Sequence, residues 1–166
     1  MTLGANLELK ARDRDPARSL RVCEELGAVD EGTLAQLDTY FVVPRGRLKL
    51  REQAGSEAQL IAYERSDDRD DKEGRYRLVA VPDPDELKAA LAGTLGVRVE
   101  VRKDRRLFLW EGVRIHLDQV EGLGAFIEFE GVATADRDAA SFTPLLADLR
   151  HRLDIEDDDL LAGSYS

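Results

Sequence analysis

The stretch Arg47-Leu48-Lys49-Leu50-Arg51 alternates cationic and leucine side chains. Such an alternation is typical of a β-strand, because successive side chains of a strand point to opposite faces of the sheet. A second alternating run covers residues 34–43, and Pro44 and Gly46 supply turn residues between the two runs. The sequence therefore predicts a β-hairpin whose return strand has cations on one face and leucines on the other.

Charged side chains recur at every second position in further predicted strands. In most sheets a polar face of this kind is simply solvated, so one such strand says nothing about function. If the apolar faces pack outward against helices, however, the charged faces must point into the hydrated interior of a barrel. The recurring groups are Glu8 and Lys10, then Arg47, Lys49 and Arg51, then Lys103 and Arg105, then Arg114 and Asp118, then Glu128 and Glu130.

Three helices are predicted between and after the strands. Asp15 is a suitable N-cap for the first helix, and Gly27 ends it. Asp85 is expected to cap a second helix over residues 86–94, and a long amphipathic third helix is expected over residues 135–153. With about eight strands, mostly in hairpins, the pattern favours an antiparallel α+β fold.

Length, net charge and cysteine content exclude several classes of protein. The chain of 166 residues shows no linker that would divide it, so one domain over residues 1–166 is expected. Its formal net charge of −10 argues against nucleic-acid wrapping and against binding to anionic membranes, because both need a basic surface. Cys23 is the only cysteine, which excludes a disulfide within the chain and a cysteine-based zinc site. Since neither a signal peptide nor a membrane-spanning apolar run is recognisable, a cytoplasmic protein is expected.

Inward-facing charges of both signs predict bound ions of both signs. Ammonium and guanidinium groups crowded inside a barrel repel one another, whereas a polyphosphate would bind several of them through charge-assisted hydrogen bonds. Inward carboxylates are explained by hard divalent cations, which prefer oxygen ligands and bridge to phosphate oxygens. The pattern therefore favours a polyphosphate ligand with Mg²⁺ or Mn²⁺ as cofactor. A solvated sheet face without a ligand is the alternative interpretation.

Six segments of the chain follow one another in an order and spacing that identify a family. They are Asn6-Leu7-Glu8-Leu9-Lys10, residues 36–41, residues 46–51, Val101 with Lys103 and Arg105, residues 114–118, and Glu128-Phe129-Glu130. These segments resemble the signature strands of the CYTH family, also called triphosphate tunnel metalloenzymes, including its Glu-x-Glu-x-Lys, Val-x-Lys-x-Arg and Arg-x-x-x-Asp elements. Within the family they are most similar to the class IV adenylyl cyclase-like branch, and the resemblance covers nearly the whole chain.

The resemblance implies an eight-stranded antiparallel β-barrel, the triphosphate tunnel, with flanking helices. Its interior would hold a triphosphate-containing small molecule together with Mg²⁺ or Mn²⁺. The implied metal ligands are Glu8, Asp118, Glu128 and Glu130. The implied phosphate ligands are Lys10, Arg47, Lys49, Arg51, Arg65, Lys103, Arg105 and Arg114. The residues expected to act in catalysis are Lys10, Glu8 and Glu130.

Two tunnel residues have open roles. Asn6 stands where the family has its first signature glutamate, and its side chain offers an oxygen but no charge. This change could weaken one of two metal sites or adapt the site to a different nucleophile. His116 lies on the same predicted face as Arg114 and Asp118, where it could contact the ligand, although a hydrogen bond to a tunnel neighbour is the favoured role.

The attacking group decides the reaction that such a tunnel performs. With water, the protein is a triphosphatase acting on tripolyphosphate, thiamine triphosphate or a nucleoside triphosphate. With the ribose 3′-hydroxyl of ATP, it is a class IV adenylyl cyclase that forms cyclic AMP and pyrophosphate. The alternatives from other classes are a non-catalytic module that binds a polyphosphate or nucleotide, and a purely structural barrel. The oligomeric state is open, and a homodimer is compatible with the sequence.

Overall fold

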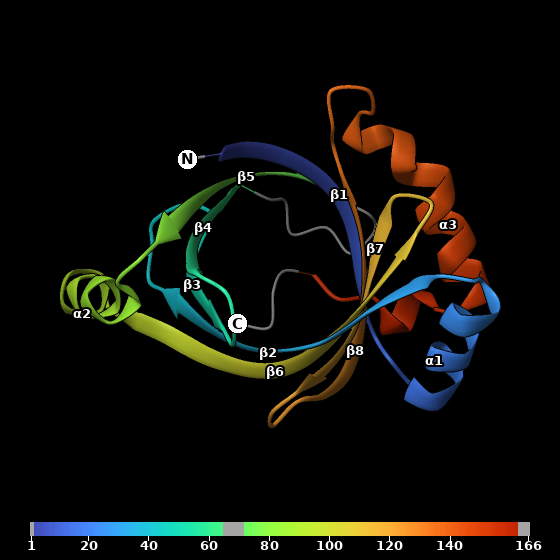
Figure 1. Ribbon diagram of the computed structural model, residues 1–166, viewed down its shortest axis with the longest axis horizontal. Helices are drawn as coiled ribbons and strands as arrows, with labels where there is room; N and C mark the ends of the chain where they lie inside the picture. The colour runs from blue at the N-terminus through green and yellow to red at the C-terminus, as the bar shows by residue number, and fades with distance from the viewer. Residues whose placement is uncertain (1, 65–71, 163–166) are drawn as a thin grey trace.

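The computed structural model describes residues 2–64 and 72–162 and forms a closed barrel of eight antiparallel strands (Figure 1). Around the barrel the strands follow the order β1-β5-β4-β3-β2-β6-β7-β8, and β8 pairs with β1 to close it. The strands are β1 (Thr2–Arg12), β2 (Val29–Phe41), β3 (Arg47–Gln53), β4 (Ala58–Glu64), β5 (Lys72–Val81), β6 (Val97–Trp110), β7 (Val113–Val120) and β8 (Gly124–Val132). This architecture confirms the expected α+β fold, an eight-stranded antiparallel barrel with flanking helices.

The period of two along each strand decides which side chains enter the barrel. In β8, Ile127 and Phe129 are fully buried in the main hydrophobic core outside the barrel wall. Burial of each such side chain contributes roughly 1.5–3 kcal/mol to folding, which fixes the orientation of the strand. The alternate residues Glu128 and Glu130 must then face inward, because a shift by one residue would place the apolar side chains in the tunnel.

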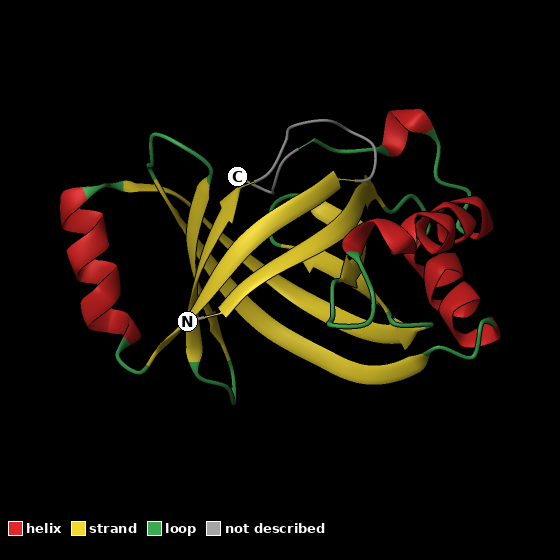
Figure 2. Cartoon of the chain, turned by 90° about the horizontal axis from the view of Figure 1, so that it is seen from above, coloured by secondary structure: helices red, strands yellow, loops and turns green. Residues whose placement is uncertain are grey.

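Of the three α-helices that the described chain forms, two lie at one end of the molecule and the third lies at the other end. They are α1 (Pro16–Glu25), α2 (Pro84–Thr94) and α3 (Thr143–Arg152), with the short 3₁₀ helices η1 (Ala139–Phe142) and η2 (Asp157–Asp159) beside α3. α1 and α3 lie together at one end, where Cys23 and Leu149 join the main core, and α2 lies at the other (Figure 2). None of the helices in the described part of the chain is long and apolar enough to span a membrane.

Gly131 allows η1 to approach the barrel closely. A Cβ atom added to Gly131 would lie 2.2 Å from the ring of Phe142, which is far inside van der Waals contact. Phe142 is itself almost completely buried in the main core. The absence of a side chain at Gly131 therefore lets the ring pack directly on β8, next to the inward-facing Glu130.

Two helix predictions are wrong in detail. The N-cap of α2 is Asp83, whose carboxylate accepts a hydrogen bond from the Glu86 amide at 3.3 Å, and Asp85 lies inside the first turn. Pro84 can occupy the first helical position because that position needs no amide hydrogen, so the helix begins earlier than expected. The third helix begins at Thr143 instead of residue 135, since the preceding residues form a short β-bridge and then η1.

Candidate active site in the barrel

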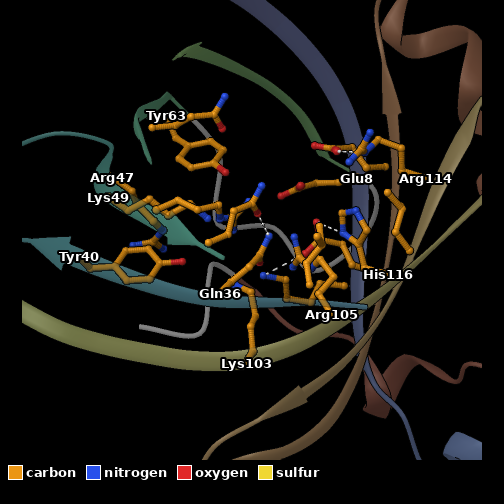
Figure 3. A pocket seen from close by; sticks show the side chains of 18 residues that line it. Glu8, Gln36, Tyr40, Arg47, Lys49, Tyr63, Lys103, Arg105, Arg114 and His116 are labelled. Carbon is orange, nitrogen blue, oxygen red and sulfur yellow. Dashed lines mark hydrogen bonds and ion pairs between the residues drawn. The ribbon is translucent and has the colours of Figure 1, made fainter. Parts of the chain in front are cut away.

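The inward faces of the strands enclose a cavity of about 160 Å³ (Figure 3). Its lining brings together nearly all the side chains that the sequence predicted for phosphate and metal binding. These are Glu8, Lys10, Arg47, Lys49, Arg51, Lys103, Arg105, Arg114, Glu128 and Glu130. Arg65, the remaining predicted phosphate ligand, lies outside the described residues, and Asp118 lies just behind the lining.

Three glutamates form one group at the junction of β1 and β8. One carboxylate oxygen from each of Glu8, Glu128 and Glu130 lies within 4.8 Å of the others. The pairing of Glu8 with Glu130 across the two strands produces this proximity, because both side chains face inward at the same level. Three hard oxygen donors at this separation fit Mg²⁺ or Mn²⁺, which prefer oxygen ligands.

The carboxylate of Glu128 is held by two neighbours. Lys10 Nζ lies 3.2 Å from Glu128 Oε2, and His116 Nδ1 lies 3.4 Å from Glu128 Oε1. Burial alone would raise the pKa of Glu128, but the charge of Lys10 and the contact with His116 hold it well below its usual value. The group is therefore an anion at neutral pH, as a metal ligand must be.

Glu130 has one hydrogen-bonded oxygen and one oxygen at ion-pair distance from a cation. Asn6 Nδ2 donates a hydrogen bond to Glu130 Oε2 at 2.7 Å, and Arg114 Nε lies 3.7 Å from Glu130 Oε1. Asn6 is almost completely buried, whereas Arg114 is partly open to solvent. The predicted signature position therefore contributes an amide donor to a neighbouring carboxylate.

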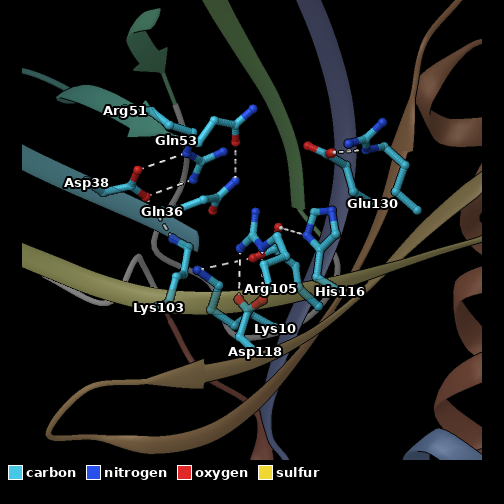
Figure 4. Close-up of polar contacts among 12 residues, drawn as sticks. Lys10, Gln36, Asp38, Arg51, Gln53, Lys103, Arg105, His116, Asp118 and Glu130 are labelled. Atoms are coloured by element: carbon cyan, nitrogen blue, oxygen red, sulfur yellow. Dashed lines mark hydrogen bonds and ion pairs between the residues drawn. The ribbon is translucent and has the colours of Figure 1, made fainter. Parts of the chain in front are cut away.

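Asp38 holds three of the tunnel cations in place, and Figure 4 shows two of them, Arg51 and Lys103, beside it. Its carboxylate is 0% exposed and accepts hydrogen bonds from Arg51 at 2.8 and 2.7 Å, from Lys103 at 2.7 Å and from Lys49 at 3.3 Å. Burial would raise the pKa of Asp38, but the charges of Lys49, Arg51 and Lys103 hold it well below its ordinary value. Asp38 is thus the shared counter-ion of Lys49, Arg51 and Lys103, which together form the cationic wall of the cavity.

The role of Asp38 was missed from the sequence, although a signal existed. Asp38 belongs to the same inward face of β2 as Gln36 and Tyr40, and so it points at the cations of the two neighbouring strands. A wall of buried ammonium and guanidinium groups needs a buried counter-ion, because each unpaired buried charge costs several kcal/mol. That requirement could have identified Asp38.

Asp118 is bound to Arg105 and stands apart from the three glutamates. Arg105 donates to both oxygens of Asp118, from Nε at 2.9 Å and from Nη2 at 2.8 Å (Figure 4). Burial would raise the pKa of Asp118, but the charge and hydrogen bonds of Arg105 lower it. The metal role of Asp118 stays a prediction, and the observed geometry gives it another task, the orientation of Arg105.

Polar and aromatic side chains complete the cavity. Tyr40 and Tyr63 flank Lys49, whose Nζ lies 5.5 and 5.2 Å from the two ring centroids. Gln36 donates to Gln53 at 2.8 Å. His116 is also buried, and neither of its ring nitrogens has a hydrogen-bond partner among the described residues.

The protonation of His116 follows from its surroundings. Burial and the nearby charge of Arg105 lower the pKa of His116, and the opposing effect of Glu128 is smaller. The imidazole is therefore neutral near pH 7, with one ring nitrogen beside Glu128 and the other in the cavity wall. His116 contacts its tunnel neighbour Glu128 at 3.4 Å without meeting hydrogen-bond geometry, so the favoured hydrogen bond to a tunnel neighbour stays a prediction.

Comparisons with known proteins agree with this geometry. The CYTH domain model matches residues 5–165. The PH1012 protein of Pyrococcus horikoshii is 27% identical, with a TM-score of 0.83 and coverage of 96% of both chains. A candidate adenylate cyclase from Vibrio parahaemolyticus is 19% identical, with a TM-score of 0.73 and coverage of 96% of this chain and 94% of its own. HpAC1 from Hippeastrum, a candidate adenylyl cyclase with a dominant triphosphatase activity, is 18% identical, with a TM-score of 0.67 and coverage of 97% and 92%. No curated protein matches the chain by sequence.

Proposed function

Because the chain belongs to the CYTH domain family, we propose that it is a metal-dependent enzyme that binds a triphosphate in its barrel and hydrolyses a phosphoanhydride bond. One observation carries the proposal: the same cavity holds a wall of cations and a group of three carboxylates. A triphosphate alone would be repelled by the carboxylates, and a metal alone would leave the cations without a ligand. A metal-bound triphosphate matches both walls.

The cationic wall would bind and orient the phosphates. Lys49, Arg51 and Lys103 are already aligned by Asp38, so few side-chain conformations have to be lost when an anion binds. Arg51 and Arg105 both line the cavity, and two hydrogen bonds to a buried aspartate orient each guanidinium, from Asp38 for Arg51 and from Asp118 for Arg105. These groups would neutralise the negative charge that develops on the leaving phosphate.

The glutamate group would face the reacting phosphate. Glu8, Glu128 and Glu130 would hold Mg²⁺ or Mn²⁺, which when bound supplies Lewis-acid polarisation of phosphate oxygens and acidifies water. Lys10 would act from the same side, since its ammonium lies beside Glu128 and also lines the cavity. Lys10, Glu8 and Glu130 are accordingly the proposed catalytic residues.

The aromatic side chains favour hydrolysis over cyclisation of ATP. A cyclase must hold the adenine base as well as the phosphates, and bases are commonly stacked on aromatic faces. Among the described residues, the only tyrosine, phenylalanine or tryptophan side chains that line the cavity are Tyr40 and Tyr63. Lys49 lies over both rings, which leaves these faces in contact with a cation. The cavity is thus suited to a phosphate chain, and water is the proposed attacking group.

The test is incubation of the purified protein with tripolyphosphate or ATP, each with Mg²⁺ or Mn²⁺. Orthophosphate release that requires the metal is the expected result. Formation of cyclic AMP from ATP would instead assign the cyclase activity, and turnover of neither compound would overturn the proposal in favour of a binding module. Glu8→Gln is the matched variant, because it removes one carboxylate charge at nearly constant volume and should lower the rate at least about 100-fold.

A further inference from the structure

Asn6 meets the glutamate group as a hydrogen-bond donor. It lies on β1 two residues before Glu8, with its side chain on the same inward face, and it is 1% exposed. Its Nδ2 is 2.7 Å from Glu130 Oε2. The orientation of the amide follows from charge: an amide oxygen at this distance from a carboxylate oxygen would be repelled, whereas the nitrogen donates to it.

Each oxygen of Glu130 therefore has a different partner. Asn6 binds Oε2, and Arg114 Nε lies 3.7 Å from Oε1. The hydrogen bond from Asn6 is the shorter contact and comes from the more deeply buried partner. Partners of this kind orient metal-ligating carboxylates, and their loss typically lowers metal affinity about 10- to 100-fold.

The number of carboxylates in the tunnel that are available to a metal limits the number of divalent metal ions that it can hold. Among the residues that the structure describes, only Glu8, Glu128 and Glu130 form a group suited to a cation. The two other carboxylates buried in the barrel are already bound to cations, Asp118 by Arg105 and Asp38 by the cationic wall. A second divalent ion next to the first would need further negative charge, and at the nearest position the chain has a neutral amide.

We propose that Asn6 is a positioning residue that fixes Glu130 through its amide, and that the tunnel of this chain binds a single divalent ion. The inference rests on the proposed function in one respect, that the glutamate group is the metal site. It goes beyond that function by assigning the number of ions and the role of Asn6. In this arrangement one ion is held by three carboxylates, of which Glu128 is also in contact with Lys10 and Glu130 with Asn6.

The number of ions is tested with the intact protein and Mn²⁺ alone. Free Mn²⁺ is measured by electron paramagnetic resonance during a titration without triphosphate, so the result does not depend on turnover. One Mn²⁺ per chain is expected. Two ions per chain would overturn the inference even if the protein hydrolyses triphosphates, and one ion per chain would support it even if the protein proves inactive. No Mn²⁺ binding up to millimolar concentration would overturn both the inference and the proposed metal site.

Two variants with as many side-chain heavy atoms as asparagine test the role of Asn6. Asn6→Leu removes the donor and should weaken Mn²⁺ binding about tenfold or more while the count stays at one. Asn6→Asp places a second negative charge beside Glu130, so its melting temperature should fall without metal and recover with saturating Mn²⁺. If Asn6 only packs the barrel, both variants will lower the melting temperature equally with and without Mn²⁺ and leave the Mn²⁺ dissociation constant unchanged, which would contradict the inference.

Discussion

Arg105 and Asp118 face each other directly across β6 and β7 and are joined by two parallel hydrogen bonds of 2.9 and 2.8 Å. Both side chains are buried, so the pair is a fixed part of the tunnel wall. The carboxylate holds one edge of the guanidinium of Arg105, which also lines the cavity. The pair shows how a buried carboxylate orders a cation of the tunnel wall.

The Asp118→Asn variant should be strongly destabilised. It leaves the buried charge of Arg105 without its counter-ion, and breaking a buried ion pair in this way typically costs about 3–5 kcal/mol of unfolding free energy. Urea denaturation of the wild type and the variant measures the difference. If Asp118 orients Arg105, the variant will still bind one Mn²⁺ per chain under folding conditions. Unchanged stability with loss of Mn²⁺ binding would instead identify Asp118 as a metal ligand.

Acid should destabilise the protein through the buried aspartates. Asp38 and Asp118 have lower pKa values in the folded protein than in the unfolded chain, so the unfolded chain takes up more protons as the pH falls. Their contribution to stability is complete above about pH 5 and is lost progressively below about pH 4. Denaturation at a series of pH values should show this decline.

The Asp38→Asn variant isolates one part of that acid effect. Since the variant has no carboxyl group to protonate at this position, its unfolding free energy should depend less steeply on pH below about pH 4 than that of the wild type. Chemical denaturation of both proteins between pH 3 and 7, at about one-unit steps, provides the comparison. Equal pH dependence in the two proteins would show that Asp38 is not held as a buried anion by the cationic wall.

The space around two glycines predicts different effects on stability when each is replaced by alanine. Gly131→Ala should destabilise the protein by about 1–3 kcal/mol, because the new methyl group would collide with the ring of Phe142. Gly93, within α2, has open space around it, so Gly93→Ala should be neutral or stabilise by up to about 1 kcal/mol. Thermal unfolding of both variants checks this. A Gly131→Ala protein as stable as the wild type would contradict the described packing.

Cys23 should be chemically inert in the folded protein. Its side chain is fully buried in the main core, and burial raises the pKa of the thiol to about 12. Since only the thiolate reacts, a thiol reagent such as dithiobis(nitrobenzoate) at pH 8 should modify the native protein far more slowly than the protein unfolded in guanidinium chloride. Equally fast modification in both states would mean that α1 does not stay docked on the barrel.

The period of two made much of this structure predictable. The alternation in Arg47-Leu48-Lys49-Leu50-Arg51 separates the leucine that packs under α2 from the cations that line the cavity. The same rule turned Glu128 and Glu130 inward, since Phe129 between them had to reach the core. The barrel and most of the charged side chains of its lining therefore followed from local pattern and family resemblance.

The partners of each charged group could not be predicted in the same way, because they depend on the register between strands. Asp118 and His116 both face inward on β7, but His116 is the residue that pairs with Glu128, and Asp118 pairs with Phe126. A shift of two residues would exchange these positions without changing the hydrophobic pattern. The grouping of Asp118 with the glutamates came from the family resemblance and stays a prediction, and the same dependence on register hid Asp38 as the counter-ion of three cations.

The most direct test is a crystal structure of the protein with tripolyphosphate and Mn²⁺, with the metal located by its anomalous scattering. We expect one Mn²⁺ bound by Glu8, Glu128 and Glu130, and a phosphate chain that reaches from this ion to Lys49 and Lys103. Tripolyphosphate bound outside the barrel, or Mn²⁺ bound away from the three glutamates, would contradict this expectation.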